Sequence, residues 1–123
     1  MARTPVVMVV DDRPDELSRI EAVLANEKIT VKSYASGEMC LADVKQIKPD
    51  MILLDAVIPD LSGLEVCNRL QQDQQTKAIP IVFLSCLHHQ DNISTMMQAG
   101  SKAVLEQPIT ADKLMSTVKQ FLN

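Results

Sequence analysis

Two apolar stretches of this 123-residue chain each run directly into carboxylates. Pro5–Val10 is followed by Asp11 and Asp12, and Met51–Leu54 is followed by Asp55. Short apolar runs bounded by turn residues are typical of strands that are buried on both faces of a parallel sheet. The carboxyl ends of such strands meet at one edge of the sheet, where open α/β folds place their ligand sites. We therefore expect Asp11, Asp12 and Asp55 to share one crevice.

Three carboxylates in one crevice repel one another, and a divalent cation is the simplest remedy. Oxygen ligands suit Mg²⁺ or Mn²⁺, and Mg²⁺ is commonly held by one or two carboxylates together with a phosphate oxygen. A cation beside an aspartate also permits phosphoryl transfer to that aspartate. Ser85 follows a third apolar run, Ile79–Leu84, and its hydroxyl is placed to donate a hydrogen bond to a phosphoryl oxygen. Each residue by itself is more often a cap or a solvated loop residue, so the prediction depends on their combination.

Strand and helix patterns alternate along the whole chain. This regularity predicts right-handed βαβ crossovers and a three-layer α/β sandwich with a five-stranded parallel sheet in the order 2-1-3-4-5. That order places the first and third strands side by side, which would bring the three carboxylates together. The expected strands are Pro5–Val10, Ile29–Tyr34, Met51–Asp55, Ile79–Leu84 and Ala103–Leu105, and the expected helices are Pro14–Asn26, 36–47, Leu64–Gln72, Asp91–Ala99 and 110–122.

The composition excludes several functional classes. With 46% hydrophobic and 23% charged residues the chain is globular, and its length suits one domain over residues 1–123. A net charge of −4 gives no support for nucleic-acid binding. No apolar run approaches the length of a membrane span, and the first residues do not form a signal peptide. The three cysteines lack metal-binding spacing, so we expect reduced thiols in a cytoplasmic protein.

Four sequence features occur together at matching spacing along the whole chain. They are Val9–Asp12, Asp55–Gly63, Ser85 after its apolar strand, and Gly100 with Pro108-Ile109. With these features the whole chain resembles a receiver domain of the two-component response regulators, which have a flavodoxin-like topology. The resemblance implies that Asp55 accepts a phosphoryl group from a histidine kinase or a histidine phosphotransfer protein.

The resemblance also assigns roles to the residues around Asp55. It implies that Asp11 and Asp12 hold Mg²⁺ with help from Asp55 and the backbone carbonyl of Val57. Ser85 would be the switch hydroxyl. A domain of this kind is not a conventional enzyme, because the aspartate that it helps to phosphorylate is its own. The bond before Pro108 would be cis, which costs little only because it precedes a proline.

One departure from the family concerns charge. The family has a lysine immediately before the proline of the last strand, and here that residue is Gln107, whose amide carries no charge. Charge-assisted hydrogen bonds to phosphate are about twice as strong as neutral ones, so a phosphorylated state should be held less firmly. Lys102 precedes the last strand and should lie at the opposite edge of the sheet. We hypothesise that Arg13 compensates in part, in which case Arg13→Ala should weaken phosphorylation.

A second departure concerns signal output. The family's switch aromatic is here Val104, whose side chain is too short to act as that gate. Output to a partner protein or domain would use the face formed by 91–99, 103–106 and 110–122, and it should then run through shifts around Ser85-Cys86. Val57 and Leu87 flank the acceptor with apolar surface, and the resemblance suggests slow autodephosphorylation. A homodimer is left open.

Two other functions compete with the phosphoacceptor. In the first, a degenerate receiver acts as a protein-interaction module without phosphorylation, which Gln107 and Val104 favour. In the second, the chain is a phosphatase with an aspartyl nucleophile, but such enzymes place a second acid where this chain has Val57. The pair His88-His89 with Asp91 suggests a second metal site or a phosphohistidine, although exposed histidines of a loop are usually only solvated.

Overall fold

Strands and helices alternate along the residues that the structure describes, which are 4–58, 60–85 and 93–122. The structure is a computed structural model. Its strands are β1 (Val6–Val10), β2 (Thr30–Tyr34), β3 (Met51–Asp55), β4 (Ile81–Ser85) and β5 (Ala103–Glu106). Its helices are α1 (Pro14–Ala25), α2 (Gly37–Ile47), α3 (Gly63–Gln72), α4 (Ile93–Gln98) and α5 (Ala111–Phe121).

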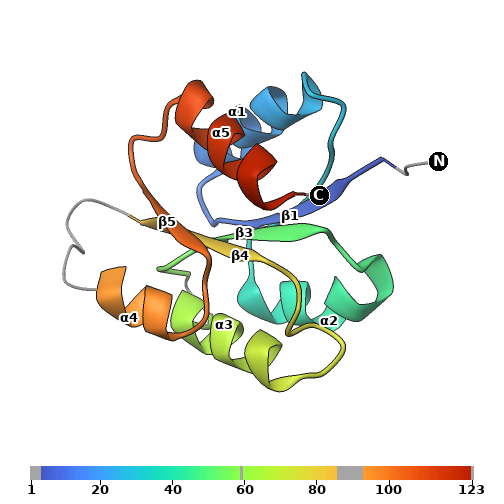
Figure 1. The fold of residues 1–123 in the computed structure, drawn as a ribbon, viewed down its shortest axis with the longest axis vertical. Helices are drawn as coiled ribbons and strands as arrows, with labels where there is room; N and C mark the ends of the chain where they lie inside the picture. The colour runs from blue at the N-terminus through green and yellow to red at the C-terminus, as the bar shows by residue number, and fades with distance from the viewer. Residues whose placement is uncertain (1–3, 59, 86–92, 123) are drawn as a thin grey trace.

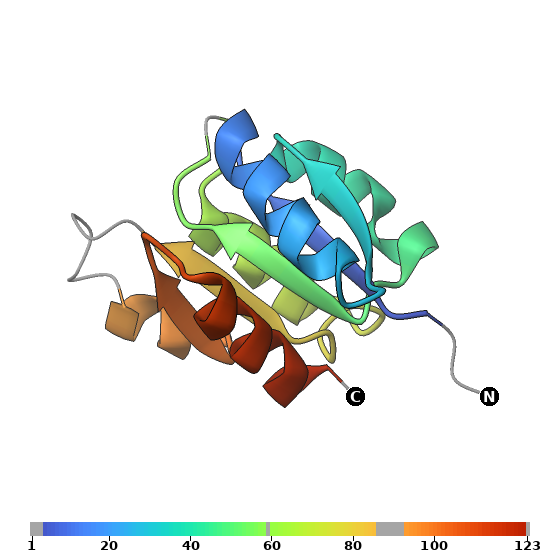
Figure 2. The same ribbon diagram turned by 90° about the horizontal axis from the view of Figure 1, so that it is seen from above.

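The strands form one parallel sheet in the order β2-β1-β3-β4-β5. Helices α1 and α5 cover one face of this sheet, and α2, α3 and α4 cover the other (Figures 1 and 2). The predicted three-layer α/β sandwich and its strand order are therefore confirmed. None of the described helices is long and apolar enough to cross a bilayer.

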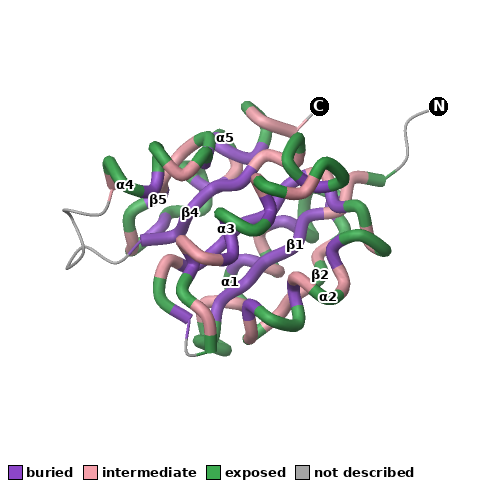
Figure 3. Tube along the Cα trace, turned by 90° about the horizontal axis from the view of Figure 1, so that it is seen from below, coloured by how far each residue is buried: buried purple, intermediate pink, exposed green. Residues whose placement is uncertain are grey.

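The core lies on both sides of the sheet, because the central strands are covered on both faces. Every residue of β3 and β4 is buried, and Figure 3 shows this buried centre with exposed residues along the helices. Alternate residues of β3 serve opposite faces: Leu53 packs in the cluster that includes residues of α1 and α5, whereas Leu54 packs in the cluster that includes residues of α2 and α3. Burial of these apolar side chains on both faces fixes where β3 ends, and so where Asp55 lies.

Most predicted boundaries agree with the structure to within one or two residues. One expected strand began too early: β4 begins at Ile81 rather than Ile79. The Ile79 amide donates to the carbonyl of Thr76 at 3.0 Å in a turn, and Pro80 has no N–H to give to the sheet. Helix α1 likewise ends at Ala25, one residue before the predicted end. The predicted start of α4 at Asp91 lies outside the described residues.

Candidate functional site

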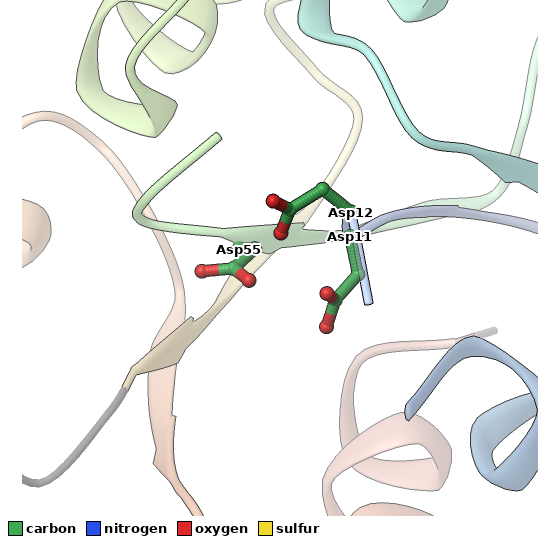
Figure 4. Close-up of side chains that lie close together, drawn as sticks. All are labelled: Asp11, Asp12 and Asp55. Atoms are coloured by element: carbon green, nitrogen blue, oxygen red, sulfur yellow. The ribbon is translucent and has the colours of Figure 1, made fainter. Parts of the chain in front are cut away.

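The acidic residues gather where β1 and β3 end. Val10 pairs with Leu54 in the sheet, so Asp11 and Asp55 follow at the same level on adjacent strands. Carboxylate oxygens of Asp11, Asp12 and Asp55 all lie within 4.8 Å of one another, and Figure 4 shows the three side chains close together. Asp11 and Asp55 are buried, whereas Asp12 is exposed. The three carboxylates therefore lie close together as expected, and we call these three residues the acidic pocket.

Arg13 lies against this acidic pocket. Its Nε lies 3.4 Å from Oδ1 of Asp11, and one terminal nitrogen lies 3.4 Å from Oδ2 of Asp11 and 3.9 Å from Oδ2 of Asp55. The backbone amide of Arg13 also donates to Oδ1 of Asp11 at 2.9 Å. The contact with Asp11 raises the pKa of Arg13. Arg13 therefore lies within reach of Asp11 and Asp55, and its compensation for the missing lysine stays a prediction.

The Asp55 carboxyl lies in an environment that disfavours its charge. Burial, and next the nearby Asp11 carboxylate, raise the pKa of Asp55 to about 7. A hydrogen bond of 2.9 Å from the Val57 amide and the charge of Arg13 act in the opposite direction. Three carboxylates with one guanidinium leave a formal charge of −2 when all three are ionised. The oxygen donors and this uncompensated charge both fit a divalent cation such as Mg²⁺.

The ends of β4 and β5 form the other side of the site. Ser85 is the last residue of β4, is 1% exposed, and lies one position beyond the partner of Asp55. The backbone amide of Gln107 donates to the carbonyl of Ser85 at 2.7 Å, and the bond from Gln107 to Pro108 is cis, as predicted. Within the described part of the chain, the side-chain nitrogen of Gln107 is buried and has no hydrogen-bond partner. A buried donor without an acceptor is unfavourable.

Three other residues that the sequence singled out, Lys102, Val104 and Val57, are described by the structure. The amide of Lys102 donates to the carbonyl of Ile81 at 2.8 Å, at the edge where β4 begins, so Lys102 is far along the strand from Ser85. Val104 pairs with Phe83 and is half-buried against the core that faces α2, α3 and α4. Val57 is 56% exposed beside the acceptor. Cys86, Leu87, His88, His89 and Asp91 lie outside the described residues.

The loop after β3 contains two residues whose roles the sequence did not reveal. The carboxylate of Asp60 accepts hydrogen bonds from the hydroxyl of Ser36 at 2.9 Å and from the amides of Gly37 and Glu38 at 3.1 and 3.0 Å. Asp60 therefore ties the loop after Asp55 to the first turn of α2. The sequence separation of 22 to 24 residues gives no local signal for this contact.

Gly63 is the second such residue. A Cβ atom at this position would lie 2.5 Å from the carbonyl oxygen of Asp55. Only glycine lets the start of α3 approach the backbone of the acceptor this closely. Its amide donates to the carbonyl of Ala56 at 3.1 Å, which fixes the approach. The sequence indicated Gly63 only as part of a turn.

The sequence matches the response regulator receiver domain family over residues 7–119. It is 28% identical to the protein PilH of Pseudomonas aeruginosa over 94% of this chain and 96% of PilH. It is 31% identical to the response regulator PleD of Caulobacter vibrioides over 94% of this chain, but over only 25% of PleD.

Solved structures give the same result for the fold. A structure described as a response regulator from Chloroflexus aurantiacus J-10-fl superimposes with a TM-score of 0.94, at 28% identity, over 98% of both chains. The receiver domain of the sensor histidine kinase PA1611 from Pseudomonas aeruginosa PAO1, which has a magnesium ion in its active site cleft, superimposes with a TM-score of 0.89 at 22% identity, over 98% of both chains.

Proposed function

The chain belongs to the response regulator receiver domain family of two-component signalling, and on that basis we propose that Asp55 is its phosphoacceptor. The observation that carries this proposal is the convergence of Asp11, Asp12 and Asp55, whose carboxylate oxygens lie within 4.8 Å of one another. Asp55 is the member at the end of β3, in the middle of the sheet edge where ligands bind in folds of this kind. Residues 1–123 make up one receiver domain in this proposal.

The acidic pocket would hold Mg²⁺, or Mn²⁺ in its place. Asp11, Asp12 and Asp55 would be ligands, and the backbone carbonyl of Val57 would complete the protein's share. When bound there, the ion supplies positive charge that offsets the charge of the phosphoryl oxygens. The oxygen-only donor set supports this assignment, and the PA1611 receiver, which shares the fold, has a magnesium ion in its cleft.

The reaction would transfer a phosphoryl group from a phosphohistidine to Asp55. A carboxylate oxygen of Asp55 attacks phosphorus, the new P–O bond forms, and the P–N bond breaks. The leaving imidazole nitrogen keeps the electron pair and takes up a proton. The product is an acyl phosphate on Asp55, whose slow hydrolysis would return the carboxylate.

Three further side chains would act on the transferred group. The Ser85 hydroxyl would donate a hydrogen bond to one phosphoryl oxygen. The buried side-chain nitrogen of Gln107, which has no partner among the described residues, would donate to another. Arg13, which already contacts Asp11 and approaches Asp55, would supply part of the positive charge that the family's lysine normally gives.

The partners in this proposal follow from the family. A histidine kinase or a histidine phosphotransfer protein would donate the phosphoryl group, and an output protein or domain would recognise the face formed by α4, β5 and α5. Within α4, Met97 is 45% exposed, whereas Met96 is buried. A homodimer through the same face is a further alternative.

Intact-mass analysis tests the proposal directly. The parent chain incubated with Mg²⁺ and a small acyl phosphate should gain one phosphoryl group, and Asp55→Asn should gain none. Asp60→Asn is the matched control, since it removes an exposed carboxylate five residues further along the same loop, and it should still be modified. A parent chain that stays unmodified, or Asp55→Asn that is still modified, would contradict the proposal. An unmodified parent would favour the degenerate receiver.

A further inference from the structure

We propose that Arg13 is a built-in counterion of the acidic pocket that competes with the divalent cation for Asp11 and Asp55. The inference rests on the proposed function in one respect, since it assumes that the acidic pocket binds Mg²⁺. It concerns a different property, which is how strongly the ion binds and what holds the carboxylates together before the ion arrives.

The contacts of Arg13 cover atoms that a cation would need. The guanidinium lies 3.4 Å from each carboxylate oxygen of Asp11 and 3.9 Å from Oδ2 of Asp55. Asp11 has no exposed surface, so its charge depends on neighbours rather than on water. Arg13 is thus the cation that the acidic pocket already contains.

The position of Arg13 is set by the local sequence. Pro14 follows it, and a residue before proline is restricted to extended conformations; Arg13 has φ −101° and ψ 112°. The hydrogen bond from its own amide to Asp11 holds the backbone at the acidic pocket. The Asp11-Asp12-Arg13-Pro14 sequence therefore places the guanidinium beside the carboxylates.

The location of Arg13 at the start of α1 supports a role in the acidic pocket rather than in the helix. Ser36, Ser62 and Thr110 occupy the equivalent position of α2, α3 and α5, and each accepts a hydrogen bond from its helix. The side chain of Arg13 has no acceptor atom, and at the described start of α1 it makes no cap hydrogen bond. A cation at the positive end of a helix is also unfavourable. The carboxylates offset this cost.

Competition follows from charge and from exposure. Arg13 lowers the negative charge that attracts a divalent ion, and it covers both oxygens of Asp11. Its side chain is 49% exposed, so it can leave the carboxylates and enter solvent without disturbing the core. Binding of Mg²⁺ would release the guanidinium, which would then be free to face a phosphoryl group.

Isothermal titration calorimetry with Mg²⁺ tests the proposal on the parent chain and three variants. Arg13→Ala should bind Mg²⁺ roughly three- to tenfold more tightly, and Arg13→Lys should fall between it and the parent. Arg19→Ala is the matched control, because Arg19 is also on α1, is 41% exposed and pairs with Glu16 at 3.0 Å. Its affinity should stay close to that of the parent. Equal or weaker binding by Arg13→Ala would overturn the proposal.

Melting temperatures provide a second readout that needs no phosphorylation. Arg13→Ala should melt lower than the parent in EDTA, and this difference should shrink in saturating Mg²⁺, whereas Arg19→Ala should show the same difference in both. An Arg13→Ala effect that Mg²⁺ does not change would also overturn the proposal, including the case in which no variant binds Mg²⁺. The phosphoacceptor role of Asp55 is decided separately by the mass measurement.

Discussion

The two halves of the site differ in the kind of residue that the sheet presents. At the ends of β1 and β3, the site has three carboxylates whose oxygens lie within 4.8 Å of one another, and the Arg13 guanidinium lies beside two of them, Asp11 and Asp55. At the ends of β4 and β5, it has a buried hydroxyl at Ser85 and a neutral amide at Gln107, and β5 has Val104 where the family has an aromatic ring. Both departures from the family that the sequence shows, Gln107 and Val104, therefore lie in the second half.

This difference assigns phosphorylation of Asp55 to one half of the site and the response to phosphorylation to the other half. The acidic half would bind the ion and supply the phosphoacceptor, whereas the missing lysine belongs to the other half. The β4–β5 half would sense the new group, and there the chain has neither the charge of a lysine nor the reach of a ring. We expect phosphorylation to survive these substitutions better than signal output through β5 does.

The largest expected effect is on the free energy of unfolding and comes from the ionisation of Asp55 in the acidic half. The pKa of Asp55 is raised from 3.8 to about 7, so the folded protein binds the proton more tightly than the unfolded chain. The protonated Asp55 carboxyl therefore contributes stability that is fully present below about pH 4 and is lost as the pH rises through about 7. Asp55→Asn should be more stable than the parent in EDTA at pH 8, by about 2–4 kcal/mol, and nearly equal to it near pH 4. Urea unfolding at both pH values measures the difference.

Asp60→Asn gives the control of opposite sign. The pKa of Asp60 is lowered, mainly by the hydrogen bond from the Glu38 amide, so its carboxylate favours folding at neutral pH. Asp60→Asn should show no gain in stability at pH 8. A gain as large as that of Asp55→Asn would mean that general charge repulsion, and not the acidic pocket, causes the effect.

A smaller effect is expected from restoring charge to the β4–β5 half. In Gln107→Lys, an ammonium replaces the amide whose nitrogen is buried without a described partner. A charge-assisted contact should speed phosphorylation by a small acyl phosphate about tenfold. Time-resolved intact-mass analysis measures the rate, and Gln107→Met, which removes the donor, should be slower than the parent.

Comparison of the parent with Gln107→Lys also tests whether the acidic half is sufficient for phosphorylation. If the parent is inert and Gln107→Lys is modified, the acidic half alone is insufficient, and the degenerate receiver becomes the better description. If both react at the same rate, Arg13 already supplies the charge that the lysine would bring.

The acidic half could be predicted from the sequence because its determinants are local. Met51–Asp55 is an apolar run that ends in a carboxylate, and the alternation of strands and helices fixes which strand lies beside it. Arg13 follows Asp11 by two residues, so the contact between these two residues is local in the sequence. These features depend on periodicity and on neighbours within two or three residues.

The features that the sequence did not reveal depend on contacts between distant segments. In the sequence Asp60 looks like an ordinary polar turn residue, and its role depends on the start of α2, which lies beside it only in the folded chain. The need for glycine at position 63 depends on the close approach of α3 to the carbonyl of Asp55. The buried nitrogen of Gln107 likewise depends on tertiary packing. Contacts between segments that are distant in the sequence cannot be predicted from composition or from residue spacing.

The smallest expected effect concerns the loop that joins the acidic half to α2. Asp60 accepts hydrogen bonds from the amides of Gly37 and Glu38, whereas the amide of Met39 is bonded to the Ser36 hydroxyl at 3.3 Å. Asp60→Ala should therefore speed hydrogen exchange at Gly37 and Glu38 by about tenfold and leave Met39 almost unchanged.

Hydrogen exchange measured by NMR also tests whether this loop, rather than β5, transmits the effect of phosphorylation at Asp55. If modification of Asp55 moves the loop, the same amides of α2 should change their protection in the phosphorylated parent, and that response should be lost in Asp60→Ala. Ser62→Ala is the matched control, since its hydroxyl accepts from the Glu65 amide at 3.2 Å and caps only α3. Unchanged protection at Gly37 and Glu38 on phosphorylation would show that the contact with α2 is purely structural, and it would leave β4 and β5 as the route of the response.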